Sequence, residues 1–152
     1  MMTISIAIEN PDQPDIVALL QAADDWYATL YPAESNHLLD VSTLQQPDIA
    51  FFVARENDGR LLGFGAVANR GDYAEIKRMY LAPSARGRKL GRRILEALEA
   101  HAAERGQSCF RLETGIHQPE AIGLYRSHGY REIGPFGSYG PDPLSLFMEK
   151  RL

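Results

Sequence analysis

The chain has 152 residues, of which 45% are hydrophobic and 24% charged, and its formal charge is −4. This profile predicts one globular domain over residues 1–152, long enough to bury roughly 70% of its unfolded surface without metal or disulfide staples. The single cysteine, Cys109, excludes an internal disulfide. Because no apolar run approaches the roughly 20 residues that span a bilayer, and the first residues lack the features of a signal peptide, we expect a cytoplasmic protein without a membrane partner.

The charges are segregated along the chain. Residues 1–54 carry eight acidic side chains and no Lys or Arg, whereas residues 77–93 carry seven basic side chains and no acidic one. Removing that block of +7 from the total of −4 leaves −11 on the rest of the chain. A basic patch concentrated in one segment of an acidic protein predicts a localised anionic ligand, and argues against a broad nucleic-acid interface.

The first half of the chain predicts a strand, a helix and a hairpin. Alternating apolar residues predict a half-buried strand over 3–10, and apolar residues at helical spacing predict an amphipathic helix from residue 15 to 30. Runs 49–57 and 61–69 are strand-like, and the Asp58-Gly59 pair between them indicates a tight turn. In the second run, Gly63 and Gly65 formally match a dinucleotide-binding fingerprint. They lie inside a strand, however, where glycines indicate a bulge or a close backbone approach.

The second half alternates strands with helices. A strand over 73–81 is ended by Pro83, and apolar spacing predicts a helix over 90–102 that stops before Gly106. The remaining segments are a buried strand at 109–114, a short helix at 118–128 closed by Gly129, and terminal strands at 130–133 and 144–150. This order predicts an α/β (α+β) fold, with a mixed sheet and helices on its faces.

The joint between strand 73–81 and helix 90–102 is the clearest functional feature. Unpaired backbone N–H groups and the positive end of the helix dipole meet there, and together they form an anion site. Gly87 and Gly91 let the backbone approach a ligand closely, and basic side chains add charge for phosphate. A solvated charge run that caps an ordinary helix is the alternative on these grounds. The basic side chains are Arg86, Arg88, Lys89, Arg92 and Arg93.

At this joint the sequence resembles the GNAT superfamily of acyl-CoA-dependent N-acetyltransferases. The family's pyrophosphate loop reads Q/R-x-x-G-x-G/A, and residues 86–91 supply its first and last positions, with Lys89 where the middle glycine is usual. Downstream, residues 118–130 match the family segment N-x-x-A-x-x-L-Y-x-x-x-G-F/Y, with Gln118 in place of the usual Asn. The matched positions are Ala121, Leu124, Tyr125, Gly129 and Tyr130.

The resemblance implies an acetyl-CoA-dependent N-acetyltransferase whose sheet is mostly antiparallel and has about six or seven strands. The CoA diphosphate would rest on the loop amides, and the pantetheine arm would pair with strand 73–81. A backbone amide there would polarise the thioester carbonyl while a primary amine attacks it directly. No metal is implied, and the four histidines show no metal-ligand spacing. The expected cofactor-binding residues are Met79, Tyr80, Leu81, Arg86, Gly87, Arg88, Lys89, Leu90, Gly91, Arg92 and Gln118.

Proton transfer needs a base and an acid. The attacking amine has to be neutral, and Glu75 occupies the strand position from which some family members use a glutamate as base. Its alternative role is an ion pair with Lys77, which shares its face of the strand. His37 and His117 are rival bases. Tyr125 matches the family's tyrosine general acid for the departing CoA thiolate, and its alternative role is that of a core aromatic residue.

Family acceptor sites lie between the first helix, the loop after it and the late-strand loops. Aromatic and acidic side chains in those segments would hold a cationic amine by cation–π contact and charge pairing, so we expect a small-molecule primary amine as acceptor. A lysine or N-terminal peptide acceptor, a non-catalytic acyl-CoA-binding module and a homodimer stay open. The candidate acceptor residues are Tyr27, Tyr31, Glu34, His37, His117 and Tyr139.

Overall fold

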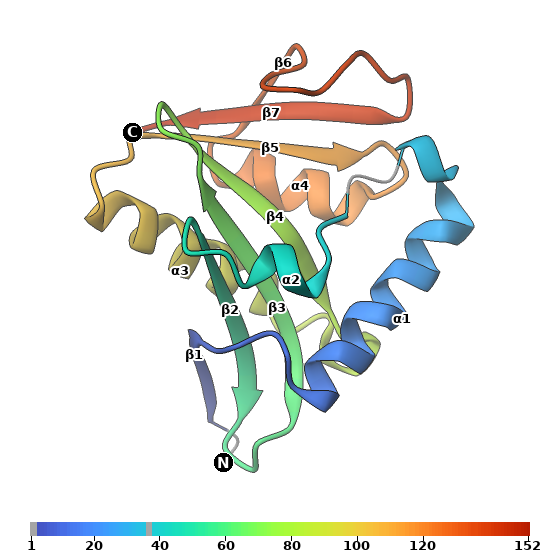
Figure 1. Cartoon of the computed structure of the whole chain (residues 1–152), viewed down its shortest axis with the longest axis vertical. Helices are drawn as coiled ribbons and strands as arrows, with labels where there is room; N and C mark the ends of the chain where they lie inside the picture. The colour runs from blue at the N-terminus through green and yellow to red at the C-terminus, as the bar shows by residue number, and fades with distance from the viewer. Residues whose placement is uncertain (1–2, 36–37) are drawn as a thin grey trace.

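The computed structural model describes residues 3–35 and 38–152, and over these residues the chain forms a seven-stranded sheet of order β1-β2-β3-β4-β5-β7-β6 (Figure 1). Among the described strands, β4 and β5 run parallel and the other neighbouring pairs run antiparallel. The predicted mixed, mostly antiparallel sheet is therefore confirmed. The strands are β1 (Ile4–Ile8), β2 (Ile49–Glu56), β3 (Leu61–Asn69), β4 (Ala74–Leu81), β5 (Cys109–Gly115), β6 (Arg131–Ile133) and β7 (Ser145–Arg151).

Helices cover both faces of the sheet (Figure 1). The α-helices are α1 (Pro14–Leu30), α2 (Val41–Leu44), α3 (Leu90–Glu104) and α4 (Pro119–Ser127), and short 3-10 helices η1 (Ala33–Ser35) and η2 (Pro83–Ala85) lie in the connections. On one face, α3 and α4 pack their apolar residues against the sheet, and on the other face α1 does so. Within the described residues, no helix is long and apolar enough to cross a membrane.

The two long helices follow their predicted apolar stripes. In α1, Pro14 occupies the first turn, where its missing N–H costs nothing, and Ile16 and Leu20 on the inward face are buried. In α3, Ile94 and Leu98 are fully buried four residues apart. Burial of these stripes fixes both helices against the sheet, so the loop that precedes α3 is held at a defined place beside β4.

A bulge interrupts the pairing of β3 with β4. The register shifts between Phe64 and Ala66, and Arg78 on the opposing strand has φ 58°, a left-handed value that non-glycine residues rarely adopt. The facing Gly65 is required by close packing, because a Cβ atom added there would lie 2.7 Å from Met79 Sδ. An added Cβ on Gly63 would lie 2.7 Å from the carbonyl oxygen of Tyr80. The predicted bulge and close backbone approach are both confirmed.

The sheet opens between its two parallel strands. Residues Ala74–Ile76 of β4 pair with Phe110–Leu112 of β5, and in the described chain this ladder extends no further. Beyond it the strands diverge (Figure 1), while β5 stays paired with β7 up to Gly115. In the described chain, the carboxyl-terminal half of β4 therefore has no β5 residues paired along its edge, which we call its free strand edge.

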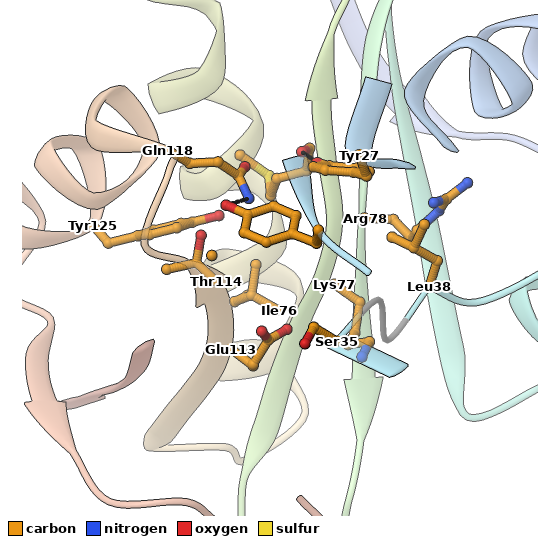
Figure 2. A pocket seen from close by; sticks show the side chains of 13 residues that line it. Tyr27, Ser35, Leu38, Ile76, Lys77, Arg78, Glu113, Thr114, Gln118 and Tyr125 are labelled. Carbon is orange, nitrogen blue, oxygen red and sulfur yellow. Dashed lines mark hydrogen bonds between the residues drawn. The ribbon is translucent and has the colours of Figure 1, made fainter. Parts of the chain in front are cut away.

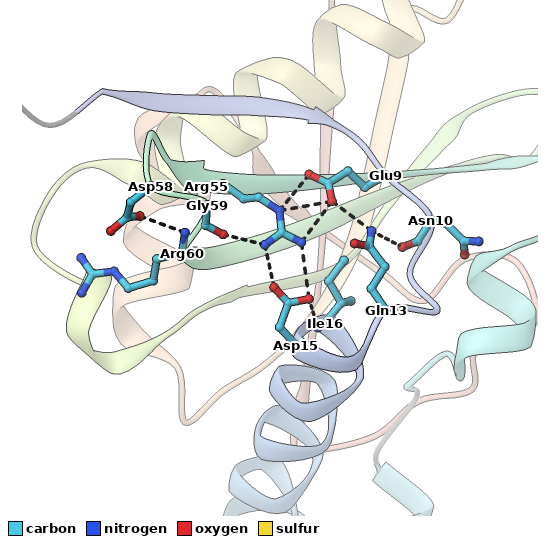
Figure 3. A network of polar contacts seen from close by, with 9 residues as sticks. All are labelled: Glu9, Asn10, Gln13, Asp15, Ile16, Arg55, Asp58, Gly59 and Arg60. Atoms are coloured by element: carbon cyan, nitrogen blue, oxygen red, sulfur yellow. Dashed lines mark hydrogen bonds and ion pairs between the residues drawn. The ribbon is translucent and has the colours of Figure 1, made fainter.

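Arg55 joins three segments at one end of the sheet (Figure 3). Its guanidinium donates to Glu9 Oε2 at 3.0 Å, to Asp15 Oδ2 at 2.6 Å and to the carbonyl oxygen of Gly59 at 2.9 Å. The chain after β1, the first turn of α1 and the β2–β3 hairpin are held together in this way. Hydrogen bonds from Arg55 are the main cause that lowers the pKa of the Glu9 and Asp15 carboxyl groups below their ordinary values.

We expect Arg55→Gln to lower the free energy of unfolding by about 1–2 kcal/mol at neutral pH, since charge-assisted bonds at a partly exposed site are of that order. A carboxyl group whose pKa is lowered by folding stabilises the fold above its unfolded pKa, which is about 4. That contribution is lost as the pH falls through the folded pKa. Urea unfolding of both proteins at pH 7 and at about pH 3 checks this. The difference between them should shrink in acid, and a constant difference would contradict the prediction.

Candidate active site

The divergence of β4 from β5 creates a cleft of about 370 Å³, which we call the β4–β5 cleft. Side chains of β4 form one wall, the loop before α3 closes one end, and α4 forms the other wall. Among the expected cofactor residues, the cleft is lined by Met79, Tyr80, Leu81, Arg86, Gly87, Gly91 and Gln118. A second hollow continues from it past Lys89, Leu90, Gly91 and Arg92 at the start of α3.

The loop before α3 has the backbone geometry of an anion site. Gly87 has φ 83° and Lys89 has φ 57°, so two residues of the loop are left-handed immediately before α3 begins at Leu90. Lys89 thus adopts the conformation that the usual glycine would take. The first backbone N–H groups of a helix have no partner within it, so the amides of α3 are available to a ligand at this end.

The basic side chains of this loop do not all face the cleft. The guanidinium of Arg86 lies 5.5 Å from the ring centroids of both Trp26 and Tyr80. Arg88 is directed instead to the carboxylate of Glu56, with Nη1 3.0 Å from Oε1. Arg86 thus lies over an aromatic pair that lines the cleft, formed by Trp26 of α1 and by Tyr80, one of the expected cofactor-binding residues.

At the inner end of the cleft lies a smaller pocket of about 70 Å³, which we call the Tyr125 pocket (Figure 2). It shares Tyr27, Met79, Gln118 and Tyr125 with the cleft, so the two hollows are adjacent. Figure 2 shows that its side chains come from α1, β4, β5 and α4, and from the segment after α1 that carries Ser35 and Leu38. Among the described residues, its lining is Tyr27, Tyr31, Ser35, Leu38, Ile76, Lys77, Arg78, Met79, Glu113, Thr114, Gly115, Gln118 and Tyr125.

Tyr125 is 5% exposed and its hydroxyl points into this pocket (Figure 2). Burial is the main cause that raises its pKa above the ordinary value for tyrosine, and the nearby Tyr27 and Glu113 raise it further. Burial also raises the pKa of Tyr27 to about 12. Both phenols therefore keep their protons at neutral pH, as a proton donor must.

Tyr31 lines the Tyr125 pocket and contacts the segment between β5 and α4. Its hydroxyl oxygen accepts hydrogen bonds from the backbone N–H of His117 at 3.1 Å and from Gln118 Nε2 at 3.4 Å. The His117 ring stacks on the Tyr31 ring at a centroid distance of 5.5 Å. Gly115 is needed beside it, because a Cβ atom there would clash with the Tyr31 ring and hydroxyl. The end of α1 is thus fixed against the loop that enters α4.

Glu75 lies in a neighbouring hollow that we call the Tyr139 pocket, which contains Tyr139, Arg70 and Lys77 among its lining residues. Tyr139 Oη donates to Glu75 Oε2 at 2.6 Å, Arg70 Nε lies 3.1 Å from Oε1, and Lys77 Nζ lies 3.6 Å from Oε2. Glu75 as a whole residue is 3% exposed. The ion pair with Lys77, which was the alternative role of Glu75, is therefore present in the structure.

Lys77 lines both the Tyr139 pocket, which contains Glu75, and the Tyr125 pocket. Its Nζ donates to Tyr139 Oη at 2.6 Å. Burial is the main cause that lowers the pKa of Lys77, and the carboxylates of Glu75 and Glu113 oppose that shift. The Lys77 ammonium group and the Glu113 carboxylate thus line the Tyr125 pocket, whereas Glu75 is not among the described residues that line it.

Glu113 is the carboxylate that lines the Tyr125 pocket, and sequence reasoning missed it. It comes from β5 beside the neighbouring Thr114 (Figure 2), and its Oε2 accepts a hydrogen bond from Ser145 Oγ at 2.8 Å. The sequence feature that could have indicated Glu113 is its place as a charged residue near the end of a mostly buried strand. Ligand sites commonly gather at the carboxyl ends of parallel strands.

The expected acceptor residues are divided among these hollows. Tyr27 and Tyr31 line the Tyr125 pocket, His117 lines the β4–β5 cleft, and Tyr139 lines its own pocket. Glu34 is exposed on η1 and does not occur among the described residues that line these three hollows. His37 lies outside the described residues.

No group of three or more His, Cys, Asp or Glu in the described parts of the chain is arranged to hold a metal ion. The site offers instead a basic loop at a helix N-terminus, a cleft along a free strand edge, and a pocket that contains a tyrosine and a carboxylate. These are features of a site for an anionic cofactor and for proton transfer.

Comparisons with known proteins agree with this arrangement. Residues 17–130 match the model of the Acetyltransferase (GNAT) family. An IAA acetyltransferase of Azospirillum brasilense is 52% identical over 154 positions and covers 100% of both chains. A structure assigned as an acyl-CoA N-acyltransferase, from Klebsiella pneumoniae, is 39% identical with a TM-score of 0.86, covering 99% of this chain and 98% of that one. The PaiA N-acetyltransferase of Thermoplasma acidophilum, solved with coenzyme A, shares the fold, with 20% identity, a TM-score of 0.77 and 99% coverage of both chains.

Fold, site and comparisons define an acyltransferase enzyme. Within that class, the chain belongs to the GNAT family of N-acetyltransferases, as its two sequence motifs predicted. Enzymes of this family use acetyl-CoA as the acetyl donor.

Proposed function

We propose that this protein transfers an acetyl group from acetyl-CoA to the primary amine of a small molecule. The observation that carries the proposal is the Tyr125 pocket, whose volume of about 70 Å³ suits a compact acceptor group at the inner end of the β4–β5 cleft. The name of the relative that is 52% identical, IAA acetyltransferase, supports a small-molecule acceptor.

The residues around the cleft fit a bound CoA thioester. The left-handed turn at Gly87 and Lys89 and the first amides of α3 would receive the diphosphate. The free edge of β4 from Met79 to Leu81 would pair with an extended arm in the cleft. Acetyl-CoA supplies an activated acetyl group as a thioester, and CoA leaves as its thiol. A β4 backbone amide held beside the thioester carbonyl would stabilise negative charge there by about 3 kcal/mol.

Two side chains of the Tyr125 pocket would move protons. Glu113 would accept the proton of the acceptor amine, because its carboxylate lines the same pocket as the reaction centre. Glu75 stays an alternative base, acting through Lys77 and Tyr139, whose hydroxyl group it already binds. Tyr125, whose phenol is protonated at neutral pH, would donate its proton to the leaving sulfur.

An acceptor screen tests this proposal. Release of free CoA thiol from acetyl-CoA is measured with polyamines, amino acids, aminoglycosides, IAA and a lysine-containing peptide, and each product is checked by mass spectrometry. We expect turnover with at least one small amine and none with the peptide. Turnover with the peptide alone would contradict the small-molecule proposal, and acetyl-CoA binding without any turnover would indicate a non-catalytic acyl-CoA-binding module.

A further inference from the structure

A buried carboxylate outside the cleft is bound to the cofactor loop. Glu56 is the last residue of β2 and is 4% exposed. Its Oε1 accepts from Arg88 Nη1 at 3.0 Å, across 32 positions of the sequence, and from Arg60 Nη2 at 2.6 Å. The β2–β3 hairpin is thereby attached to the loop that precedes α3.

The loop on the other side of this ion pair has an unfavourable backbone conformation. Arg88 stands between Gly87 at φ 83° and Lys89 at φ 57°. A left-handed lysine has its Cβ too close to the following carbonyl oxygen, and such residues persist where the surrounding structure holds them in place. Arg88 lies at the centre of the turn, and its partner Glu56 belongs to the rigid sheet.

Two other arginines of this segment, Arg86 and Arg92, have contacts of a different kind. Arg86 lies over the rings of Trp26 and Tyr80 at the cleft. Arg92 faces Glu96 on the same helix at 3.6 Å, and both side chains are more than half exposed. The Arg88–Glu56 pair, by contrast, joins the loop to a buried acidic group on another element. Its geometry is that of an anchor, and a guanidinium engaged in this way does not face the cleft.

We propose that Glu56 is a positioning residue for cofactor binding: through Arg88 it holds the turn at residues 87–89 in the shape that presents the α3 amides to the CoA diphosphate. The inference rests on the proposed function, in which this loop receives the diphosphate. Glu56 does not touch the cofactor in this role. Its loss should therefore weaken acetyl-CoA binding while the chemistry at Tyr125 proceeds at its usual rate.

The variant Glu56→Gln tests the proposal, because it keeps the size of the side chain and removes its charge. We expect the KM for acetyl-CoA and the Kd for CoA to rise about tenfold, with kcat within about twofold of wild type. Arg60→Gln is the matched control, since it removes the exposed partner of Glu56 and leaves the Arg88 pair in place. Its KM should stay at the wild-type value. An equal rise in both variants would overturn the proposal, because it would indicate general damage to the hairpin.

A double-mutant cycle separates anchoring from direct contact with phosphate. If Arg88 acts through Glu56, the variant E56Q/R88Q should bind CoA as weakly as E56Q and no more weakly. A further loss of tenfold in the double variant would show that Arg88 contacts the cofactor by itself, and would overturn the proposal.

A third comparison depends on the strain at Lys89. Lys89→Gly removes the backbone strain of the left-handed conformation at this position. The effect of E56Q on CoA binding should therefore be smaller in the K89G background than in wild type. An undiminished effect would contradict the anchoring role.

Thermal unfolding confirms that each variant is folded. If the wild-type protein does not bind CoA, the proposed function itself is refuted. If wild type and E56Q bind CoA equally well, only the Glu56 proposal fails.

Discussion

Replacing Tyr125 by phenylalanine is expected to lower kcat for acetyl transfer about 100-fold while the KM for acetyl-CoA stays within about twofold. The tyrosine ring packs against the Tyr130 ring at a centroid distance of 5.8 Å, and phenylalanine keeps that packing. The substitution therefore removes the hydroxyl group that points into the pocket and little else. Steady-state kinetics with a saturating acceptor measure the effect.

The matched control is Tyr130→Phe, a second buried tyrosine whose hydroxyl donates to Glu99 Oε2 at 2.8 Å behind the sheet. It should keep the wild-type kcat, although it lowers stability by the loss of one hydrogen bond. Because burial raises the pKa of Tyr125, its proton remains bound through the range from pH 7 to about 10. The wild-type kcat should accordingly not fall over that range through ionisation of this group. A Y125F enzyme with the wild-type kcat would exclude the role of Tyr125 as acid.

Local sequence patterns predicted the elements of the fold because each pattern reports a nearby physical requirement. The apolar stripe from Ile16 to Tyr27 needs a face to bury, and Gly59, at φ 92°, supplies the positive φ of the β2–β3 turn. The stop of β4 before Pro83 likewise follows from a missing backbone donor. Such requirements are satisfied within a few residues, so they can be read without knowledge of the partners in space.

The opening of the sheet was not predictable in this way. The ladder between β4 and β5 ends at Ile76 and Leu112, residues that are far apart in sequence and regular in pattern. The left-handed Arg78 that marks the bulge carries no glycine signal, because its conformation is imposed by packing against β3 and α1. Lys89, with φ 57°, likewise carries no glycine signal. In the sequence, this position stood out only because the family motif usually has a glycine there.

The candidate site likewise has parts that local sequence patterns predict and parts that they do not. The basic, glycine-containing turn before α3 was predictable, because charge, glycines and helix start coincide in one segment around Gly87 and Gly91. Glu113 was not, because its importance depends on which strand lies beside it and where that strand diverges. Glu75 was singled out from its position in a strand, yet the structure surrounds its carboxylate with Arg70 and Tyr139. A residue's type and strand position do not determine which hollow its side chain enters.

Glu113→Gln is expected to lower kcat about 100-fold at neutral pH, since general-base catalysis contributes on that order. The substitution is nearly isosteric, so Ser145 Oγ, 2.8 Å from Glu113 Oε2, can still donate to the side-chain carbonyl oxygen of the new glutamine. The test compares kcat of wild type and E113Q as a function of pH. As the pH approaches the pKa of the acceptor amine, more of the amine is already neutral, and the gap between the two enzymes should narrow. A gap that is independent of pH would argue against a role as base.

Glu75→Gln is the paired variant, and its expected effect is on stability more than on the reaction. It removes the charge that faces Arg70 Nε at 3.1 Å and Lys77 Nζ at 3.6 Å, and leaves a neutral acceptor for Tyr139. Breaking a buried ion pair by removing one partner costs about 3–5 kcal/mol when both groups are buried, and Arg70 is one-third exposed, so we expect about 1–3 kcal/mol here. The kcat of folded E75Q should stay within about tenfold of wild type. The opposite result would be a loss of about 100-fold in kcat for folded E75Q and no such loss for E113Q. In that case the proton leaves the amine by way of Lys77 and Tyr139, and the Tyr139 pocket is part of the catalytic machinery.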